Sequence, residues 1–237
     1  MRFVREVLWR NGRLLATCKD GYAHLNAYLD HYANLLQASL ELVQARFDPD
    51  LIGFARALAD AMLAHFQDEA AGGFFFTSHD HERLIHRPKH GYDGATPSGN
   101  AVAAFALQRL GYLVGESRYL EAAERAIGAF YPSIAAHPQA YAAFLAALDE
   151  TLEPPRIVVL RGKPAELRPW VRAIESDYRA DSILLAIESA ADVPEAALAK
   201  PAPAAGVNAY VCQGVSCSNP VKTPAALAAL LGLARSI

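Results

Sequence analysis

One short segment of the sequence gathers residue types that could bind or act on a polar ligand. Its eight residues run from Asp93 to Asn100 and read DGATPSGN. They lead into a helical pattern, and the N-terminus of a helix offers N–H groups without intrahelical partners. Asp93 and Asn100 could therefore hydrogen-bond the hydroxyl groups of a sugar. The alternative is a turn and cap, in which Ser98 caps the helix and Asp93 accepts backbone N–H groups within the loop.

A second group of polar residues, Asp20, His24 and Asp30, surrounds the first helical pattern. His24 and Asp30 are six residues apart, whereas side chains that meet on one helix face are three or four apart, so they form no local dyad. Asp30 and Asp93 could serve as the two acids of a glycosidase, about 5 to 10 Å apart, only if the tertiary fold brings them together. Tyr32, on the same helix, is part of either a cavity wall or the core.

Four histidines gather in the polar segment 78–97, which we expect to be a long loop: His79, His81, His86 and His90. Imidazole and carboxylate groups can bind zinc, but the spacing of these residues matches no compact metal motif. We therefore expect solvated histidines, with neither a metal ion nor another cofactor.

The sequence holds three cysteines, and two of them follow a predicted strand as Cys212 and Cys217. Their C-x4-C spacing differs from the two intervening residues of common redox and zinc-ribbon motifs. Two interpretations stay open: reduced thiols with a structural role in a tight turn, or a redox pair. A small and odd number of cysteines fits a reducing compartment, so we expect a cytoplasmic protein.

Up to about residue 150, apolar residues recur at steps of three and four, which indicates amphipathic helices. Asp20 could cap the first of these helices, and Pro132 is expected to end the fourth. Glycine followed by aromatic residues at 72–77 is typical of a short strand or hairpin arm. The five predicted helices cover residues 22–46, 48–66, 98–113, 119–130 and 138–148.

After Pro154-Pro155 the pattern changes to short apolar runs that suit buried strands. Helical patterns alternate with these runs, and segment 190–206 has the composition of a linker. The order strand–helix–strand indicates a small, largely parallel sheet. The three predicted strands are residues 157–160, 182–187 and 207–212, and the two helices are residues 164–176 and 224–235.

Composition limits the classes of function. Of the 237 residues, 53% are hydrophobic and 20% are charged, which argues against wholesale disorder. The net charge is −3 and no basic run is long enough to follow a phosphate backbone, so a nucleic-acid binder is disfavoured. The longest apolar stretch, near Ala225–Ala234, is far short of the roughly 20 residues that span a bilayer. The length and the change in pattern predict two domains, residues 1–151 and 152–237.

Four ordered motifs together resemble one known protein family. They are the segment Gly12–Ala33, Gly72–Thr77 with Arg87-Pro88-Lys89, the segment Asp93–Asn100, and Cys212 and Cys217 followed by Pro220-Val221. The chain resembles the C-terminal part of the thioredoxin-domain-containing, spermatogenesis-associated proteins. The resemblance implies a thioredoxin-like domain followed by an (α/α)6 toroid, similar to that of six-hairpin glycosidases and N-acylglucosamine 2-epimerases.

Parts of that family pattern are absent from this sequence. It has no Cys-x-x-Cys, and five predicted helices fall short of the six helical hairpins of the toroid. We therefore expect a chain that lacks the N-terminal thioredoxin-like part and the first half of the toroid. Uncovered apolar helix faces would make such a chain self-associate when it is isolated. His31 stands where the family tends to carry a second acid beside Asp30.

The resemblance leads to one expected fold and two hypotheses about function. The fold is mainly α, with antiparallel helical hairpins forming part of an (α/α)6 toroid, followed by a small three-stranded α/β segment. The first hypothesis is a carbohydrate-active or sugar-binding module, in which Asp93 and Asp30 carry the acid/base chemistry of hydrolysis or epimerisation. The second is a non-catalytic scaffold that binds a partner beside a thioredoxin-like domain. The residues expected to bind substrate are His24, Tyr32, Thr96, Ser98 and Asn100.

Overall fold

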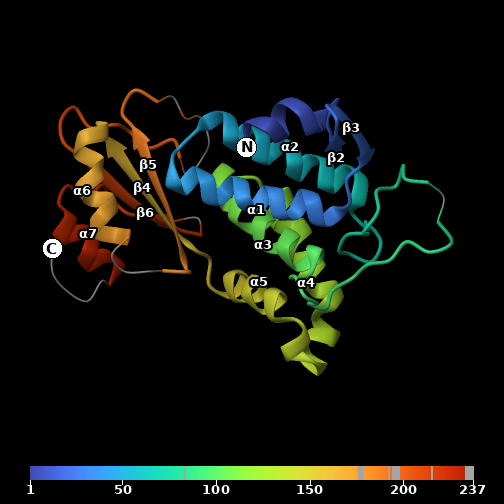
Figure 1. The fold of residues 1–237 in the computed structure, drawn as a ribbon. Helices are drawn as coiled ribbons and strands as arrows, with labels where there is room; N and C mark the ends of the chain where they lie inside the picture. Colours follow the sequence, from blue (N-terminus) through green and yellow to red (C-terminus); the bar gives the residue numbers. More distant parts are fainter. Residues whose placement is uncertain (83, 176–178, 192, 194–197, 215, 233–237) are drawn as a thin grey trace. The chain divides into compact units, whose positions relative to one another are not determined.

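The computed structural model describes residues 1–82, 84–175, 179–191, 193, 198–214 and 216–232 (Figure 1). The chain forms two compact units. The helical unit comprises Met1–Glu41, Asp50–Gly111 and Glu116–Leu152, and the sheet unit comprises Leu42–Pro49, Tyr112–Gly115 and Glu153–Ile237. That residues 1–151 and 152–237 are separate folding domains stays a prediction.

Two tight hairpins open the helical unit after a π-helical turn, η1 (Val4–Leu8). The strands β1 (Trp9–Arg10), β2 (Arg13–Lys19) and β3 (Tyr22–Asn26) pair antiparallel in the order β1-β2-β3. The turns are Asn11-Gly12 and Asp20-Gly21, and all four of these residues have positive φ. This is the backbone of type I′ turns, which Asn-Gly and Asp-Gly favour.

The prediction of one helix over residues 22–46, capped by Asp20, is therefore wrong in its first third. Thr17 pairs with His24 across β2 and β3, and the helix α1 covers Leu29–Ala45. The hairpin turn at Asp20-Gly21 overrides the helical spacing of the following residues, because it reverses the chain into a register with β2.

The other helices predicted in this unit exist, with shifted ends. They are α2 (Pro49–Phe66), α3 (Gly99–Val114), α4 (Ser117–Ala136) and α5 (Ala142–Leu152), with a 3₁₀ turn η2 at Pro138–Ala140. Helix α4 continues past Pro132, which was expected to end it, and buries Ile134 in its last turn. Segment 72–77 is not a strand: Phe74 forms a single bridge with Gln67.

The core of the helical unit holds large side chains and one buried ion pair. Fully buried rings include Tyr32, Phe66 and Phe74. Arg109 on α3 donates from Nε to Oε1 of Glu150 on α5 at 2.9 Å, and both side chains are buried. Burial raises the pKa of the Glu150 carboxyl, and the Arg109 guanidinium opposes that rise. This pair fixes α5 against α3.

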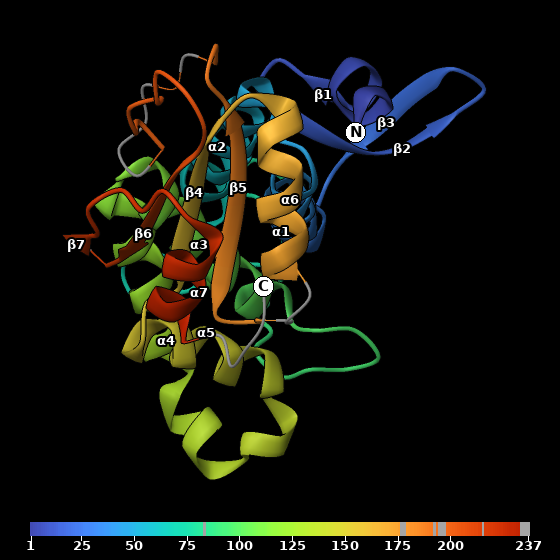
Figure 2. The ribbon, with the colours of Figure 1, turned by 90° about the vertical axis from the view of Figure 1, so that its left-hand side faces the viewer.

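The sheet unit contains β4 (Arg156–Gly162), α6 (Pro164–Glu175), β5 (Ser182–Glu188), β6 (Asn208–Gln213), β7 (Ser216–Cys217) and α7 (Pro224–Leu231). The strand order is β5-β4-β6-β7. Helices α6 and α7 lie on one face of this sheet (Figure 2). There they bury a shared apolar core that includes Leu160, Trp170 and Leu227.

The prediction of a three-stranded, largely parallel layer needs correction. Among the described residues the sheet has four strands, and only β4 and β5 are parallel, whereas β6 pairs antiparallel with β4 and with β7. Strand β7 has two residues, which is too short to give a periodic pattern. The predicted end of the last helix, residues 233–235, and residue 176 of the preceding helix lie outside the described residues.

The described residues thus form an α/β arrangement of helices with two small sheets, rather than a mainly α fold. In the described part of the chain, no helix has the length and apolar character needed to cross a bilayer.

Candidate functional site

Asp93 lies in the loop before α3, and both of its carboxylate oxygens accept backbone hydrogen bonds. Oδ1 accepts the N–H of Ser98 at 2.9 Å, just before α3 begins. Oδ2 accepts the N–H of Ala143 at 2.9 Å, in the first turn of α5. The first N–H groups of a helix have no intrahelical acceptor. The Asp93 carboxylate therefore supplies hydrogen-bond acceptors at the starts of two helices, α3 and α5. The turn-and-cap alternative therefore holds in part: Asp93 accepts backbone N–H groups, but one of them belongs to α5, and the Ser98 hydroxyl donates to His90 instead of capping α3.

Ser98 and Asn100 are buried, and their side chains also bond to the main chain. Ser98 Oγ donates to the carbonyl of His90 at 3.0 Å. Asn100 Oδ1 accepts the N–H of Phe74 at 2.7 Å, and its Nδ2 donates to the carbonyls of Phe74 at 2.9 Å and His90 at 3.0 Å. These bonds hold two separate loop segments at the start of α3. Thr96 is exposed.

Tyr32 and His24 lie away from this loop. Tyr32 is completely buried, and its hydroxyl accepts the N–H of Leu14 at 2.7 Å, so it anchors β2 to α1. His24 lies on β3, where its ring stacks on Tyr22 at a centroid distance of 5.3 Å.

Asp30, in the first turn of α1, meets the start of α3. A Cβ added to Gly99 would overlap Asp30 Oδ1, so a side chain at this position would force the carboxyl to move. Burial raises the pKa of Asp30, while the nearby His31 and His90 oppose that rise. The structure therefore brings Asp30 to the Asp93–Asn100 segment, and it gives Asp30 a different environment from Asp93.

Six ring-bearing residues form a group beside Asp30, which we call the aromatic–histidine cluster: Tyr28, His31, Phe76, His81, His90 and Tyr92. The rings of Tyr28 and Phe76 stack with centroids 4.7 Å apart and planes 7° apart. His31 and His81 lie against Tyr28 at 5.9 and 5.6 Å. His90 meets Phe76 edge-on at 6.0 Å and Tyr92 at 6.1 Å. His31, His90 and Tyr92 are exposed, and the other three are half-buried.

Sequence reasoning missed most of this cluster. His81 and His90 were considered as metal ligands, and His31 only as a departure from the family pattern beside Asp30; none of the six was expected to form a cluster of rings. The available signal was weak: three consecutive phenylalanines and a histidine-rich loop, with nothing to say which rings would meet. No group of residues suited to hold a metal ion is found within the described part of the chain.

An ionic network holds the loop that carries His81. Arg13 on β2 forms a bidentate ion pair with Asp80, with Nη2 3.0 Å from Oδ1, and also donates to Ser78 Oγ at 3.1 Å. The hydrogen bond from Arg13 keeps the pKa of Asp80 well below its usual range. Beneath it, His65 stacks on His79 at 5.1 Å, and burial lowers the pKa of His65. The hairpin that replaced the predicted helix therefore positions this loop.

The cluster offers flat ring faces and imidazole nitrogens. Asp30, beside the cluster, adds a carboxyl group that burial keeps protonated to a higher pH. Pro97 of the neighbouring segment lines a small apolar pocket of about 140 Å³, with Ala101 and Phe105. Typical pockets for small molecules have about 300 to 1,000 Å³. A ligand at this site would therefore lie on the surface cluster and not in that pocket.

Comparison with known proteins gives relatives but no reaction. No family model matches the chain. The chain is similar to human spermatogenesis-associated protein 20, with 26% identity over 93% of the chain. The rat and mouse proteins of that name are 25% and 24% identical over the same share.

The chain spans about 30% of the length of these curated relatives. Their similarity is consistent with the family suggested by the four sequence motifs. It supplies neither a substrate nor a reaction, so function has to be argued from the site.

Proposed function

We propose that the helical unit binds a carbohydrate on the aromatic–histidine cluster, with Asp30 as the acidic group of the site. The observation that carries this proposal is the partly buried Asp30 carboxyl, whose pKa is raised, next to a stacked and partly exposed pair of rings. Perturbed carboxyl groups beside a binding surface are typical of functional sites.

The cluster fits the chemistry of a sugar. A sugar ring has an apolar C–H face, which can pack on an aromatic ring, and a rim of hydroxyl groups, which need hydrogen-bond partners. Tyr28 and Phe76 supply the ring faces, and His31, His90 and Asp30 supply polar groups around them. A few polar groups placed around apolar surface are the usual composition of a ligand site.

Acid/base chemistry at this site would depend on Asp30 and not on Asp93. A protonated carboxyl can donate a proton to a sugar oxygen, and burial favours that protonated form. Both oxygens of Asp93 are engaged by backbone N–H groups. The proposal therefore gives Asp93, Ser98 and Asn100 the task of shaping the site, and it involves no Asp30–Asp93 acid pair.

A glycan array probed with the purified chain tests this proposal. We expect the chain to bind at least one immobilised mono- or oligosaccharide, and Tyr28→Ala and Asp30→Asn to lose that signal by tenfold or more. The matched controls are Tyr131→Ala and Glu121→Gln, which change exposed residues of α4. The absence of any bound glycan, or retention of the signal in Tyr28→Ala, contradicts the proposal.

A second candidate function is a non-catalytic interaction module. The observation that favours it is the loop tip, where Ile85 is fully exposed and Leu84 is partly exposed. Exposed apolar side chains on a loop are suited to a protein partner. Under this alternative, glycans fail to bind, and replacing Leu84 and Ile85 with serine removes capture of a partner that the Tyr28→Ala variant still captures.

The wider architecture is proposed on the same basis. We infer a cytoplasmic protein in which this chain forms the C-terminal part of an (α/α)6 toroid, beside a thioredoxin-like domain. Five α-helices in the helical unit and the four sequence motifs support the toroid, and the small, odd number of cysteines supports the cytoplasmic location. Self-association of the isolated chain is a further expectation, and a monomer by light scattering at micromolar concentration contradicts it.

A further inference from the structure

The sheet unit carries a disulfide bond at the edge of its sheet. Cys212 on β6 is the register partner of Cys217 on β7, and their sulfur atoms are bonded, with Cα atoms 4.0 Å apart. The N–H of Ser218 donates to the carbonyl of Val211 at 2.8 Å. The cysteines therefore occupy a non-hydrogen-bonded pair, in which facing side chains come closest. The interpretation as two reduced thiols does not describe this state.

The two sulfur atoms have different surroundings. Cys212 is 2% exposed, whereas Cys217 is exposed. Of the two cysteines, Cys217 is therefore the one more accessible to a thiol from solvent. Exposed disulfides are more readily reduced than buried structural ones.

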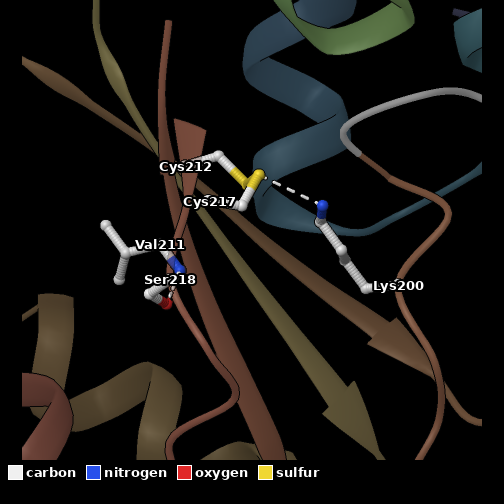
Figure 3. The surroundings of a disulfide bond; sticks show 5 residues. All are labelled: Lys200, Val211, Cys212, Cys217 and Ser218. Carbon is white, nitrogen blue, oxygen red and sulfur yellow. Dashed lines mark hydrogen bonds between the residues drawn. A yellow bond between two sulfur atoms is a disulfide. The ribbon is translucent and has the colours of Figure 1, made fainter. Parts of the chain in front are cut away.

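A cation lies next to the exposed sulfur. Lys200 reaches from the connection between β5 and β6, and its Nζ is 3.1 Å from Cys217 Sγ (Figure 3). The next residue is anchored to the sheet, because the Tyr210 hydroxyl donates to the carbonyl of Pro201 at 3.0 Å. Tyr210 on β6 is itself buried. A neighbouring ammonium group stabilises a thiolate relative to a thiol.

The disulfide adds little to holding this hairpin together. The two cysteines are five positions apart in the sequence, and cross-links that close short loops restrict the unfolded chain least. Backbone pairing between Val211 and Ser218 joins the same two strands independently. A purely structural role leaves unexplained the lysine placed on the exposed sulfur.

We propose that Cys212–Cys217 is a dithiol–disulfide exchange site, with Cys217 as the sulfur that is attacked and Lys200 as a positioning residue. Its co-reactant is a dithiol, in a protein or a small molecule. This inference concerns the sheet unit and does not depend on carbohydrate binding by the helical unit.

The exchange balances as two displacements. A thiolate of the dithiol attacks Cys217 Sγ, a mixed disulfide forms, and the S–S bond breaks with its electron pair going to Cys212. The second thiol of the dithiol, after losing its proton, then attacks its own partner sulfur and releases Cys217 as a thiolate beside Lys200. The dithiol is oxidised to a disulfide, and the two cysteines are reduced and take up the two protons.

A monothiol tests which sulfur is attacked. After Cys18, the free cysteine, is blocked with iodoacetamide, the folded chain is incubated with glutathione and digested for mass spectrometry. We expect the glutathione adduct on Cys217, with none on Cys212. Dithiothreitol should reduce the pair completely while circular dichroism shows the chain still folded. An adduct on Cys212, or reduction only after unfolding, overturns the proposal.

A pair of lysine variants tests the role of Lys200. Lys200→Met should slow both reduction by dithiothreitol and alkylation of reduced Cys217 by about 3- to 10-fold at low salt, an effect that shrinks as added salt screens the charge. Lys222→Met is the matched control, since Lys222 is exposed and lies in the same unit. Equal rates for the two variants would overturn the assignment of Lys200, and adducts on Cys217 alone would still support the exchange site.

Discussion

The Asp93–Asn100 segment and the aromatic–histidine cluster meet at Asp30 and Gly99, but they use their polar groups in opposite ways. In the segment, Asp93, Ser98 and Asn100 all direct their side chains to main-chain partners. In the cluster, rings and imidazoles are wholly or partly exposed. The comparison teaches that the most distinctive sequence motif is a frame that holds the main chain together, while the neighbouring cluster keeps its rings and imidazoles open to solvent.

The largest expected loss of stability follows from replacing Asn100, which holds main-chain segments together at the start of α3. Asn100→Ala leaves the N–H and carbonyl of Phe74 without their side-chain partner in the interior, which costs about 3 kcal/mol or more of the free energy of unfolding. Urea unfolding measures this loss. Asn34→Ala is the control, because Asn34 is exposed and makes one bond to the carbonyl of Asp30. Equal losses in the two variants would show that the hydrogen bonds of Asn100 stabilise the fold no more than an exposed one does.

The next largest loss of stability is expected when Asp93, which belongs to the frame and not to the proposed ligand surface, is replaced. Asp93→Ala removes the acceptor for N–H groups at the starts of α3 and α5, and we expect a loss of about 2 kcal/mol by urea unfolding. Asp149→Ala, on the exposed side of α5, should change stability by less than about 0.5 kcal/mol. If Asp93→Ala is as stable as the unmodified chain, the two hydrogen bonds that Asp93 accepts at the starts of α3 and α5 do not stabilise the fold.

A smaller effect is expected at the contact between Gly99 of the segment and Asp30 beside the cluster. Gly99→Ala places a methyl group against Asp30 Oδ1, and the resulting overlap should cost about 1 kcal/mol, near the low end for overpacking because the carboxyl end can move. Because removal of the carboxyl relieves the overlap, the double variant Asp30→Ala/Gly99→Ala should lose less stability than the sum of its single variants. Additive losses in this double-mutant cycle would mean that the two residues are not coupled.

The smallest effect concerns pH. Burial raises the pKa of Asp30 in the folded state, so the folded chain binds this proton more tightly than the unfolded chain. Its contribution to the free energy of unfolding therefore falls as the pH rises from the unfolded pKa through the raised one. Asp30→Asn should therefore gain stability relative to the unmodified chain as the pH rises above about 4. A difference that stays constant with pH contradicts the raised pKa.

Much of the helical framework could be predicted because its signals are local. The apolar spacing of residues 48–66 and the Asp48-Pro49 start fix α2 to within a residue. The missed hairpins also had a local signal, since Asn11-Gly12 and Asp20-Gly21 favour type I′ turns, but the helical spacing after Tyr22 was given more weight.

The site was harder to predict because it depends on contacts between distant segments. Asp30 was proposed as an acid that only the tertiary fold could bring to Asp93, and nothing in the sequence shows that it meets Gly99. The partners of Asp93 include Ala143, fifty positions away. Tyr28 and Phe76 meet only after the chain has folded, so their stacking carries no sequence pattern.

The most direct test is a glycan titration of Asp30→Asn and Asp93→Asn, side by side, at a temperature at which circular dichroism shows both folded. The account predicts that Asp30→Asn loses affinity by tenfold or more, whereas Asp93→Asn, which changes the frame and not the proposed ligand surface, loses about threefold or less. The opposite outcome, with affinity lost in Asp93→Asn and kept in Asp30→Asn, would show that the segment and not the cluster contacts the ligand.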